Sequence, residues 1–128
     1  PDQCFRWALN NRIPRPGWSK GRATIMGDAA HATLPYLAQG ANMAIEDAAI
    51  LGRMLDEFNT LPVQERLNKY ESARFERTKR IVEESTSSGK LYQQPSEEDL
   101  RTAFAARDLA GERNEWLYSY DPLTVPLS

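Results

Sequence analysis

The most constraining feature of this sequence is the stretch over residues 27–48, GDAAHATLPYLAQGANMAIEDA, with the short apolar run that precedes it at residues 22–26. An apolar run that halts at a glycine and an aspartate is typical of a buried strand ending in a turn. After a loop fixed by Pro35, an amphipathic pattern starts at Gly40 and predicts a helix over residues 40–58. The stretch therefore predicts a strand, a loop and a helix in that order.

The start of this predicted helix is a candidate ligand site. The first N–H groups of a helix have no acceptor inside the helix, and the helix dipole places positive charge at the same end. Asp28 stands at the end of the predicted strand, where a carboxylate faces a ligand or caps a turn. These groups suit an anionic or carbonyl-rich ligand.

The stretch resembles the second flavin-binding motif of the FAD-dependent aromatic-ring hydroxylases of the salicylate hydroxylase and p-hydroxybenzoate hydroxylase type. The residues that match are Gly27, Asp28, Ala29, Ala30, His31, Pro35, Gly40, Asn42, Glu46 and Asp47. So many fixed spacings are far more specific than a lone glycine pattern. The resemblance implies an FAD-dependent monooxygenase that uses NADH or NADPH and O2 to hydroxylate a small aromatic compound through a flavin C4a-hydroperoxide.

The resemblance also implies roles for individual residues. It places at the cofactor Gly27, Asp28, Pro35, Gln39, Gly40, Ala41 and Asn42. Asp28 matches the carboxylate that binds the ribityl hydroxyls, and the N–H groups of Ala41 and Asn42 would face the flavin ring. Pro35 and Tyr36 are the candidate catalytic residues, although some relatives carry histidine where this chain has Tyr36. His31 matches a residue that supports the loop.

The implied fold class is α/β: an α+β fragment, the mostly helical C-terminal part of a two-domain FAD-binding monooxygenase fold with a few strands near the N-terminus. The glycines never approach the Gly-x-Gly-x-x-Gly spacing of a dinucleotide-binding turn, and the chain begins without methionine. We therefore expect the C-terminal portion of a larger flavoenzyme, inactive by itself. Its expected parts are the end of the substrate sheet at 1–22, the flavin motif at 23–58, and C-terminal helices with a tail at 59–128.

Hydrophobic patterns predict further elements. Residues 4–10 alternate and predict a strand, followed by a turn that Trp18 anchors to the core. On a wheel of the helix at 40–58, the expected apolar stripe is Ala41, Ala44, Ala48, Leu51, Leu55 and Phe58. Glu46 is expected in solvent with Arg53 and Glu57. Asp47 falls between the two faces, so we expect it half-buried and paired with Arg74 or Arg77.

Beyond Pro62, a second helix is predicted over residues 63–88, with Gly89 as its stop. Charges of both signs interleave at residues 70–77, which favours a solvated, ion-paired face over a functional site. Ser96 and the acidic residues after it predict the N-cap of a third helix that reaches about Ala110. The aromatic tail at 116–122 is expected to form turns against the body of the protein.

Composition excludes several function classes. The net charge is −2 in 128 residues, which offers no basic field for nucleic acid or an anionic membrane. No apolar run is long enough to span a bilayer, and no signal peptide is visible, so a cytoplasmic location is expected. One histidine and one cysteine give no metal-ligand spacing. Unpaired strand edges in a fragment would favour self-association.

Two other interpretations remain open. The motif could survive as a structural turn in a non-catalytic fragment whose helices mediate association. Alternatively, the cofactor could be kept with different chemistry, because related epoxidases and reductases share the motif.

Overall fold

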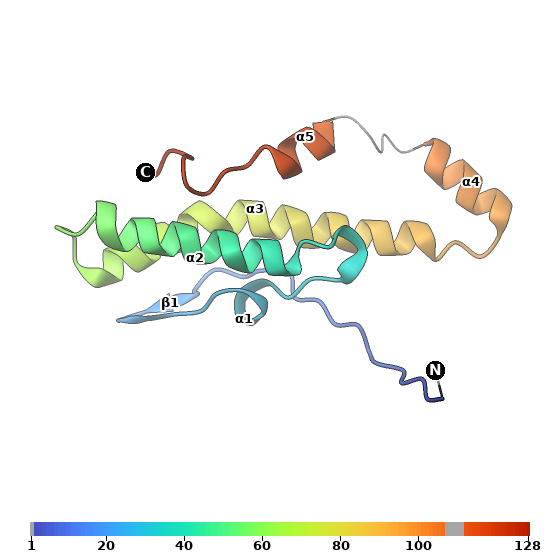
Figure 1. The fold of residues 1–128 in the computed structure, drawn as a ribbon, viewed down its shortest axis with the longest axis horizontal. Helices are drawn as coiled ribbons and strands as arrows, with labels where there is room; N and C mark the ends of the chain where they lie inside the picture. Colours follow the sequence, from blue (N-terminus) through green and yellow to red (C-terminus); the bar gives the residue numbers. More distant parts are fainter. Residues whose placement is uncertain (1, 107–111) are drawn as a thin grey trace.

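The computed structural model describes residues 2–106 and 112–128, and it is mostly helical with one short hairpin near the N-terminus (Figure 1). The elements, in order, are β1 (Ser19–Lys20), β2 (Ala23–Thr24), α1 (Asp28–His31), the 3-10 turn η1 (Pro35–Leu37), α2 (Gly40–Glu57), α3 (Val63–Tyr92), α4 (Glu97–Ala105) and α5 (Glu112–Tyr118). The predicted fold class, a mostly helical α/β fragment, is confirmed.

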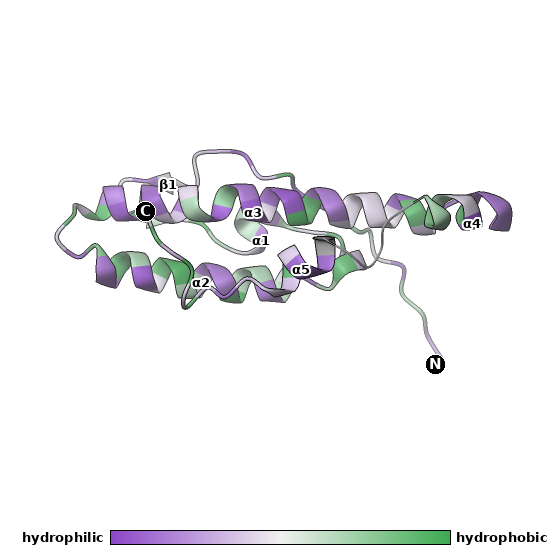
Figure 2. Ribbon diagram, turned by 90° about the horizontal axis from the view of Figure 1, so that it is seen from above, coloured by the Kyte–Doolittle hydropathy of each residue, from purple (hydrophilic) through white to green (hydrophobic). Residues whose placement is uncertain are grey.

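The long helices α2 and α3 lie side by side and form the middle layer of the molecule (Figures 1 and 2). The hairpin and α1 cover one face of this pair, and α5 with the C-terminal tail covers the other. The core consists of two clusters of buried apolar residues on either side of the pair. One contains Trp18, Ala30, Ile50, Met54 and Tyr70, and the other contains Met43, Ile81, Val82 and Leu117.

The helix predicted over 40–58 is confirmed as α2, but the predicted apolar stripe is confirmed only in part, by Leu51 and Phe58, which are half-buried against the core. The large side chains Met43, Ile50 and Met54 are fully buried, whereas Ala41, Ala48 and Leu55 of the predicted stripe are exposed. Burying a methionine or an isoleucine removes far more apolar area from water than burying an alanine, so the larger side chains determine which face packs on α3.

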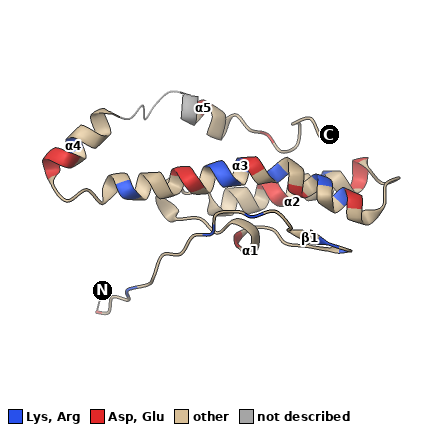
Figure 3. Ribbon diagram, turned by 180° about the vertical axis from the view of Figure 1, so that it is seen from behind, with Lys and Arg blue, Asp and Glu red and all other residues tan. Residues whose placement is uncertain are grey.

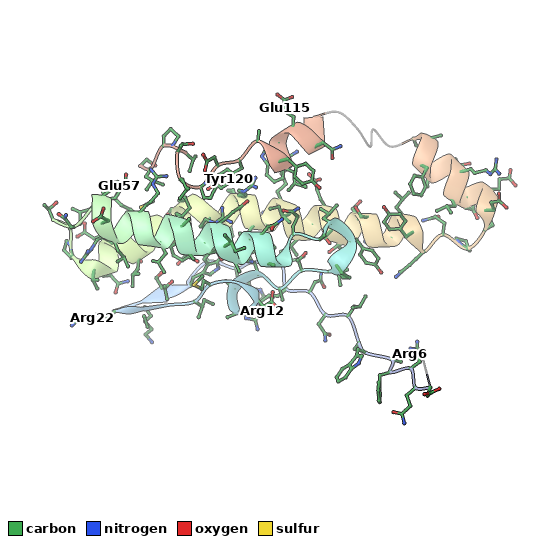
Figure 4. All side chains as sticks on the ribbon, in the orientation of Figure 1. Arg6, Arg12, Arg22, Glu57, Glu115 and Tyr120 are labelled. Atoms are coloured by element: carbon green, nitrogen blue, oxygen red, sulfur yellow. The ribbon has the colours of Figure 1, made fainter. Side chains whose placement is uncertain are left out.

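The alternating run at residues 4–10 does not form a strand in the structure. Its apolar side chains Phe5, Trp7 and Leu9 are 70%, 81% and 59% exposed. The segment extends away from the helices, and Arg6 lies near its far end (Figure 4). Among the described residues the only sheet is the pair β1 and β2, so residues 4–10 lack the neighbouring strand that a ladder requires.

The hairpin is tied to the core through Trp18, as predicted. The Trp18 side chain is 4% exposed, and its ring centroid lies 5.6 Å from that of His31 and 6.0 Å from that of Tyr70. Glu71 on α3 accepts hydrogen bonds from the N–H groups of Gly17 and Ser19, at 2.6 and 3.1 Å. The ring contacts of Trp18 and the hydrogen bonds to Glu71 together hold the residues that lead into β1 against α3.

The prediction that α3 stops at Gly89 is wrong, because the helix continues to Tyr92. Gly89 is buried there, and the Tyr36 ring fills the space in front of it: a Cβ on Gly89 would lie 2.8 Å from Tyr36 Cδ2. Glycine at this position therefore permits close packing of η1 on α3 and does not end the helix.

We expect Gly89→Ala to lower the free energy of unfolding by about 1–3 kcal/mol, because the added methyl group overlaps the Tyr36 ring. Gly52→Ala is the matched control, because Gly52 also lies inside a helix but a methyl group added there would have nothing within 4 Å. That substitution should stabilise by roughly 0.5–1 kcal/mol through helix propensity alone. Urea unfolding measures both changes, and a shift of the same sign for the two variants would contradict the packing role of Gly89.

The remaining helix predictions are confirmed in part. Ser96 caps α4 by accepting a hydrogen bond from the Asp99 N–H at 3.1 Å. The helix ends at Ala105, and residues 107–110 of the predicted helix lie outside the described residues. The tail at 116–122, expected to form turns, begins with the last three residues of α5, and a turn follows near Pro122.

Arginines of the long helices hold the C-terminal tail by its backbone. Arg53 Nη1 on α2 donates to the carbonyls of Pro122 and Val125 at 2.9 and 2.8 Å. Arg77 Nη2 on α3 donates to the Leu117 carbonyl at 3.1 Å, and its guanidinium lies 3.9 Å from the Tyr120 ring centroid. Figure 4 shows Tyr120 on the tail above the helix pair. Within the described part of the chain, no helix has the length and apolarity needed to cross a bilayer.

Candidate functional site

An open groove lies where the loop after α1 meets the start of α2. Its volume is about 640 Å³, and it is lined by Asp28, Thr33, Leu34, Pro35, Ala38, Gly40, Ala41 and Ala44. A larger hollow of about 820 Å³ lies beside residues 11–18 and contains none of the predicted site residues. The groove at α2 is therefore the candidate site.

The start of α2 supplies hydrogen-bond donors to this groove. The Met43 N–H donates to the Gln39 carbonyl at 2.9 Å, which is the first bond of the helical ladder. The N–H groups of Gly40, Ala41 and Asn42 precede that bond and have no acceptor one turn back in the helix. Because Gly40 and Ala41 line the groove, the positive end of the α2 dipole lies at its wall.

Asp28 supplies a carboxylate to the same groove. It is the first residue of α1 and is exposed to solvent. The preceding residue, Gly27, has φ 58° and ψ −142°, a combination that is essentially restricted to glycine. This turn directs the chain out of the hairpin region and places Asp28 at the edge of the groove.

The loop that forms the other edge of the groove is a tight turn tied to α3. Pro35 begins η1, and Ala38, in the left-handed conformation at φ 53°, closes it with an N–H bond to the Pro35 carbonyl at 3.0 Å. The Leu34 carbonyl accepts a hydrogen bond from Ser85 Oγ on α3 at 2.6 Å. The groove edge is therefore anchored to the longest helix of the structure.

The structure brings together Asp28, Pro35, Gly40 and Ala41 of the predicted site residues, and it places others elsewhere. Gln39 is buried, and with Asn42 it lines a separate hollow of about 260 Å³ beside the tail. The Tyr36 ring packs against Gly89 rather than lining the groove, and its hydroxyl accepts a hydrogen bond from Gln93 Nε2 at 3.1 Å.

Four lining residues were not named from the sequence: Thr33, Leu34, Ala38 and Ala44. Ala44 could have been found from helical spacing, because it lies one turn after Gly40 and Ala41 on the same face. The loop residues flank Pro35, but their orientation depends on the left-handed turn at Ala38, which an alanine does not signal.

Behind the groove lies a buried carboxylate, Asp47 on α2, with 0% of its surface exposed. Its Oδ2 accepts hydrogen bonds from the Gly27 N–H at 2.9 Å and from His31 Nε2 at 2.6 Å. Its Oδ1 accepts from Arg74 Nε on α3 at 2.7 Å. The predicted pairing of Asp47 with Arg74 or Arg77 is confirmed for Arg74, and Asp47 is more deeply buried than expected.

The charge network continues through Glu46, which the wheel had placed in solvent. Glu46 is 8% exposed, and its Oε2 accepts from Arg74 Nη2 at 2.6 Å. Arg77 binds both of its carboxylate oxygens, at 2.8 and 2.7 Å. The prediction that Glu46 is solvated is therefore wrong. The face at residues 70–77 is ion-paired as predicted, but Arg74 and Arg77 are buried, because acidic residues of α2 meet basic residues of α3 (Figure 3).

The network favours the charged forms of Asp47 and Arg74. Burial by itself would raise the pKa of Asp47, but hydrogen bonds from His31, Gly27 and Arg74 outweigh it and hold this pKa below the ordinary value of 3.8. Burial opposes the charged form of Arg74 as well, yet its bonds to Asp47 and the nearby Glu46 raise its pKa. Burial and the Asp47 charge raise the pKa of Tyr70.

No group of three or more histidine, cysteine, aspartate or glutamate side chains that could hold a metal ion occurs among the described residues. The chemical groups gathered at the groove are instead one carboxylate acceptor and a set of backbone N–H donors. Such a set suits a ligand that presents both hydroxyl groups and carbonyl or anionic oxygens.

Comparison with known proteins agrees with this interpretation. Residues 1–85 match the family model described as "FAD binding domain". The chain is 39% identical over 125 residues to 3-hydroxybenzoate 6-hydroxylase of Polaromonas naphthalenivorans (strain CJ2), covering 94% of this chain and 31% of the relative. It is 36% identical over 125 residues to 6-hydroxynicotinate 3-monooxygenase of Pseudomonas fluorescens, covering 98% of this chain and 28% of the relative.

A solved structure described as "Salicylate hydroxylase substrate complex" superimposes with a TM-score of 0.71 at 31% identity, covering 91% of this chain and 29% of that chain. The chain thus spans about a third of the length of the curated relatives that it matches.

Proposed function

The chain belongs to the FAD-binding domain family of FAD-dependent aromatic-ring monooxygenases, and from that premise we propose that the groove between α1 and α2 holds the ribityl and isoalloxazine part of FAD. The observation that carries the proposal is the meeting of the Asp28 carboxylate and the N-terminal end of α2 at one groove. The groove volume, about 640 Å³, is in the range of small-molecule sites.

The residues at the groove fit this group. The Asp28 carboxylate would accept hydrogen bonds from ribityl hydroxyls, and charged acceptors form the stronger bonds. The N–H group of Ala41 at the groove, with the backbone N–H of the next residue, Asn42, whose side chain is not part of the groove, would face the pyrimidine edge of the ring and stabilise negative charge there, as an oxyanion hole does. Pro35 would lie beside the ring, where its backbone borders the substrate. When bound, FAD would supply the redox chemistry, which is reduction by NADH or NADPH and activation of O2.

We propose that the complete protein hydroxylates a small aromatic compound. The names of its relatives, which are hydroxylases and monooxygenases, support this reaction class. Tyr36 remains a candidate for orienting the substrate, although its ring packs on α3. The division into a substrate-sheet end at 1–22, a flavin motif at 23–58 and C-terminal helices at 59–128 also remains a proposal.

The proposal extends to the isolated 128-residue chain, which we expect to be colourless and inactive. Cofactor sites bury most of the surface of their ligand, whereas Asp28 and Ala41 lie exposed at an open groove. The isolated chain would therefore leave most of the FAD surface in water and bind it weakly. The test compares visible absorption spectra of this chain and of the complete protein, followed by assays of NAD(P)H oxidation with and without aromatic acids. A complete protein without flavin absorption would overturn the proposed function, and a yellow isolated chain would overturn the predicted weakness of the fragment.

In the complete protein, Asp28→Ala should weaken FAD binding by about ten- to a hundredfold, which corresponds to the loss of a charged hydrogen bond. The fold should persist because the side chain is exposed. The apoprotein is titrated with FAD, and binding is measured by the quenching of flavin fluorescence. The control is Asp56→Ala, which removes an exposed carboxylate near the other end of α2. Equal FAD affinity in wild type and Asp28→Ala would remove Asp28 from the site.

A further inference from the structure

The helix α1, which carries Asp28, is too short to be stable without contacts to the rest of the protein. α1 has four residues, and the N–H groups of Ala30 and His31 donate to the carbonyl of Gly27, the residue before it, both at 2.9 Å. A single turn of helix is unstable in isolation, because fixing its backbone dihedral angles costs more free energy than its few hydrogen bonds contribute. The position of Asp28 in the groove must therefore be set from outside α1.

Asp47 supplies that external support at both ends of the turn. A single oxygen, Oδ2, accepts the N–H of Gly27, directly before α1, and Nε2 of His31, the last residue of α1. These contacts measure 2.9 and 2.6 Å, and the three residues are buried. The turn that carries Asp28 is thus attached at its start and at its end to one carboxylate.

Asp47 is carried by the helix whose first residues form the opposite wall of the groove. It lies on α2, whose first residues Gly40 and Ala41 supply the backbone N–H donors. The helix is rigid over this distance, so the bonds of Asp47 Oδ2 help to fix the spacing between the Asp28 carboxylate and those donors. Arg74 holds the other oxygen, Oδ1, at 2.7 Å from α3 and thereby sets the orientation of the carboxylate. Arg12 also holds the turn, because its Nη1 donates to the Ala29 carbonyl at 2.9 Å and its backbone N–H donates to the Ala32 carbonyl at 2.8 Å.

We propose that Asp47 is a positioning residue of the flavin site: through Gly27 and His31 it sets Asp28 at the spacing from the start of α2 that FAD requires. This inference rests on the proposed function, because it concerns the affinity of the same groove for FAD. Asp47 does not line the groove, so its effect on the cofactor passes through α1.

The test compares two buried carboxylates of the same network in the complete protein. Asp47→Asn keeps the shape of the side chain but removes the charge that accepts from α1. Glu46→Gln removes a charge from the neighbouring residue, which binds Arg74 and Arg77, while the three bonds of Asp47 to Gly27, His31 and Arg74 are kept. Apoprotein of each variant is titrated with FAD, and the melting temperature is recorded without FAD.

We expect both variants to melt at lower temperature, but only Asp47→Asn to lose FAD affinity, by about tenfold or more. Glu46→Gln should stay within about threefold of wild type. If Glu46→Gln loses as much affinity as Asp47→Asn at a similar melting temperature, the effect is general destabilisation and the positioning role is overturned.

A second pair of variants applies if Asp47→Asn does not fold. His31→Leu removes one of the two bonds to α1 and leaves the pair of Asp47 and Arg74 intact. His31→Gln keeps an N–H donor at a similar reach. We expect His31→Leu to weaken FAD binding by about three- to tenfold and His31→Gln to restore most of the loss. Equal affinities for wild type and His31→Leu would overturn the inference.

The experiment separates this inference from the proposed function. If Asp28→Ala loses affinity while Asp47→Asn and His31→Leu bind as wild type, the groove still holds FAD and only the positioning role falls. If the wild-type complete protein does not bind FAD, the proposed function itself is overturned, and the positioning role with it.

Discussion

Arg74→Met is expected to lower the free energy of unfolding by about 3–5 kcal/mol, because removal of one partner leaves buried charge without compensation. The Arg74 side chain is 0% exposed and binds both Asp47 and Glu46, at 2.7 and 2.6 Å. Without it, Asp47 and Glu46 would remain close together in the interior with one fewer cation between them. The measurement is urea unfolding of the complete protein, supported by the melting temperature.

The matched control is Arg80→Met on the same helix. The Arg80 side chain is 47% exposed, pairs with Glu84 four residues later at 2.9 Å, and lies 3.9 Å from the Trp116 ring centroid. An exposed ion pair and an exposed contact of a cation with an aromatic ring each contribute about 1 kcal/mol or less. Equal losses for the two variants would show that the network behind the groove contributes no more to stability than a surface ion pair.

Gly27→Ala is expected to cost at least about 2 kcal/mol of unfolding free energy and to weaken FAD binding at the same time. Space is not the main obstacle, because a Cβ on Gly27 would meet the Ala44 Cβ at 3.4 Å, an ordinary contact. The obstacle is the backbone, which has φ 58° and ψ −142°. Relaxation from this conformation would move the Gly27 N–H away from Asp47.

Gly21→Ala separates backbone strain from the effect on the site. Gly21 also has a positive φ, 61°, in the turn between β1 and β2, and a Cβ added there would have nothing within 4 Å. We expect a loss of stability with FAD affinity unchanged, because the hairpin turn does not line the groove. Normal FAD affinity in Gly27→Ala, measured by the same titration, would contradict the role of this turn in placing Asp28.

The local pattern of the sequence predicted the helix α2 but not all elements of the site or their packing. The buried strand expected at residues 22–26 is reduced to the two-residue strand β2, and the loop expected after it contains the short helix α1. The helix α2 follows from spacing, and the rule that a carboxylate on a buried flank needs a partner predicts a pair of Asp47 with Arg74 or Arg77, of which the structure has Arg74. Burial of Glu46 does not follow from α2 alone, because it depends on Arg77 of another helix. The clue available in the sequence was the matching of adjacent acids at 46 and 47 with arginines three residues apart at 74 and 77.

Two further errors come from neighbours that a local pattern does not contain. The run at 4–10 has the alternation of a strand, but a strand requires a pairing partner, and the described residues contain none beside it. Gly89 is a typical helix stop by residue type, yet the Tyr36 ring, far earlier in the chain, occupies the space that glycine leaves free. The groove lining is only partly predictable for the same reason, since Ala38 adopts its left-handed turn in the context of η1.

The way the tail is held has a consequence for sequence variation. Arg53 and Arg77 bind the tail through the carbonyl oxygens of Pro122, Val125 and Leu117, groups that every amino acid carries. Substitutions at these tail positions leave the carbonyl oxygens in place, whereas an insertion or deletion between residues 117 and 125 would shift them out of register with the arginines. The length of this segment is therefore constrained independently of its side chains, of which Leu117 packs in the core and Tyr120 contacts Arg77.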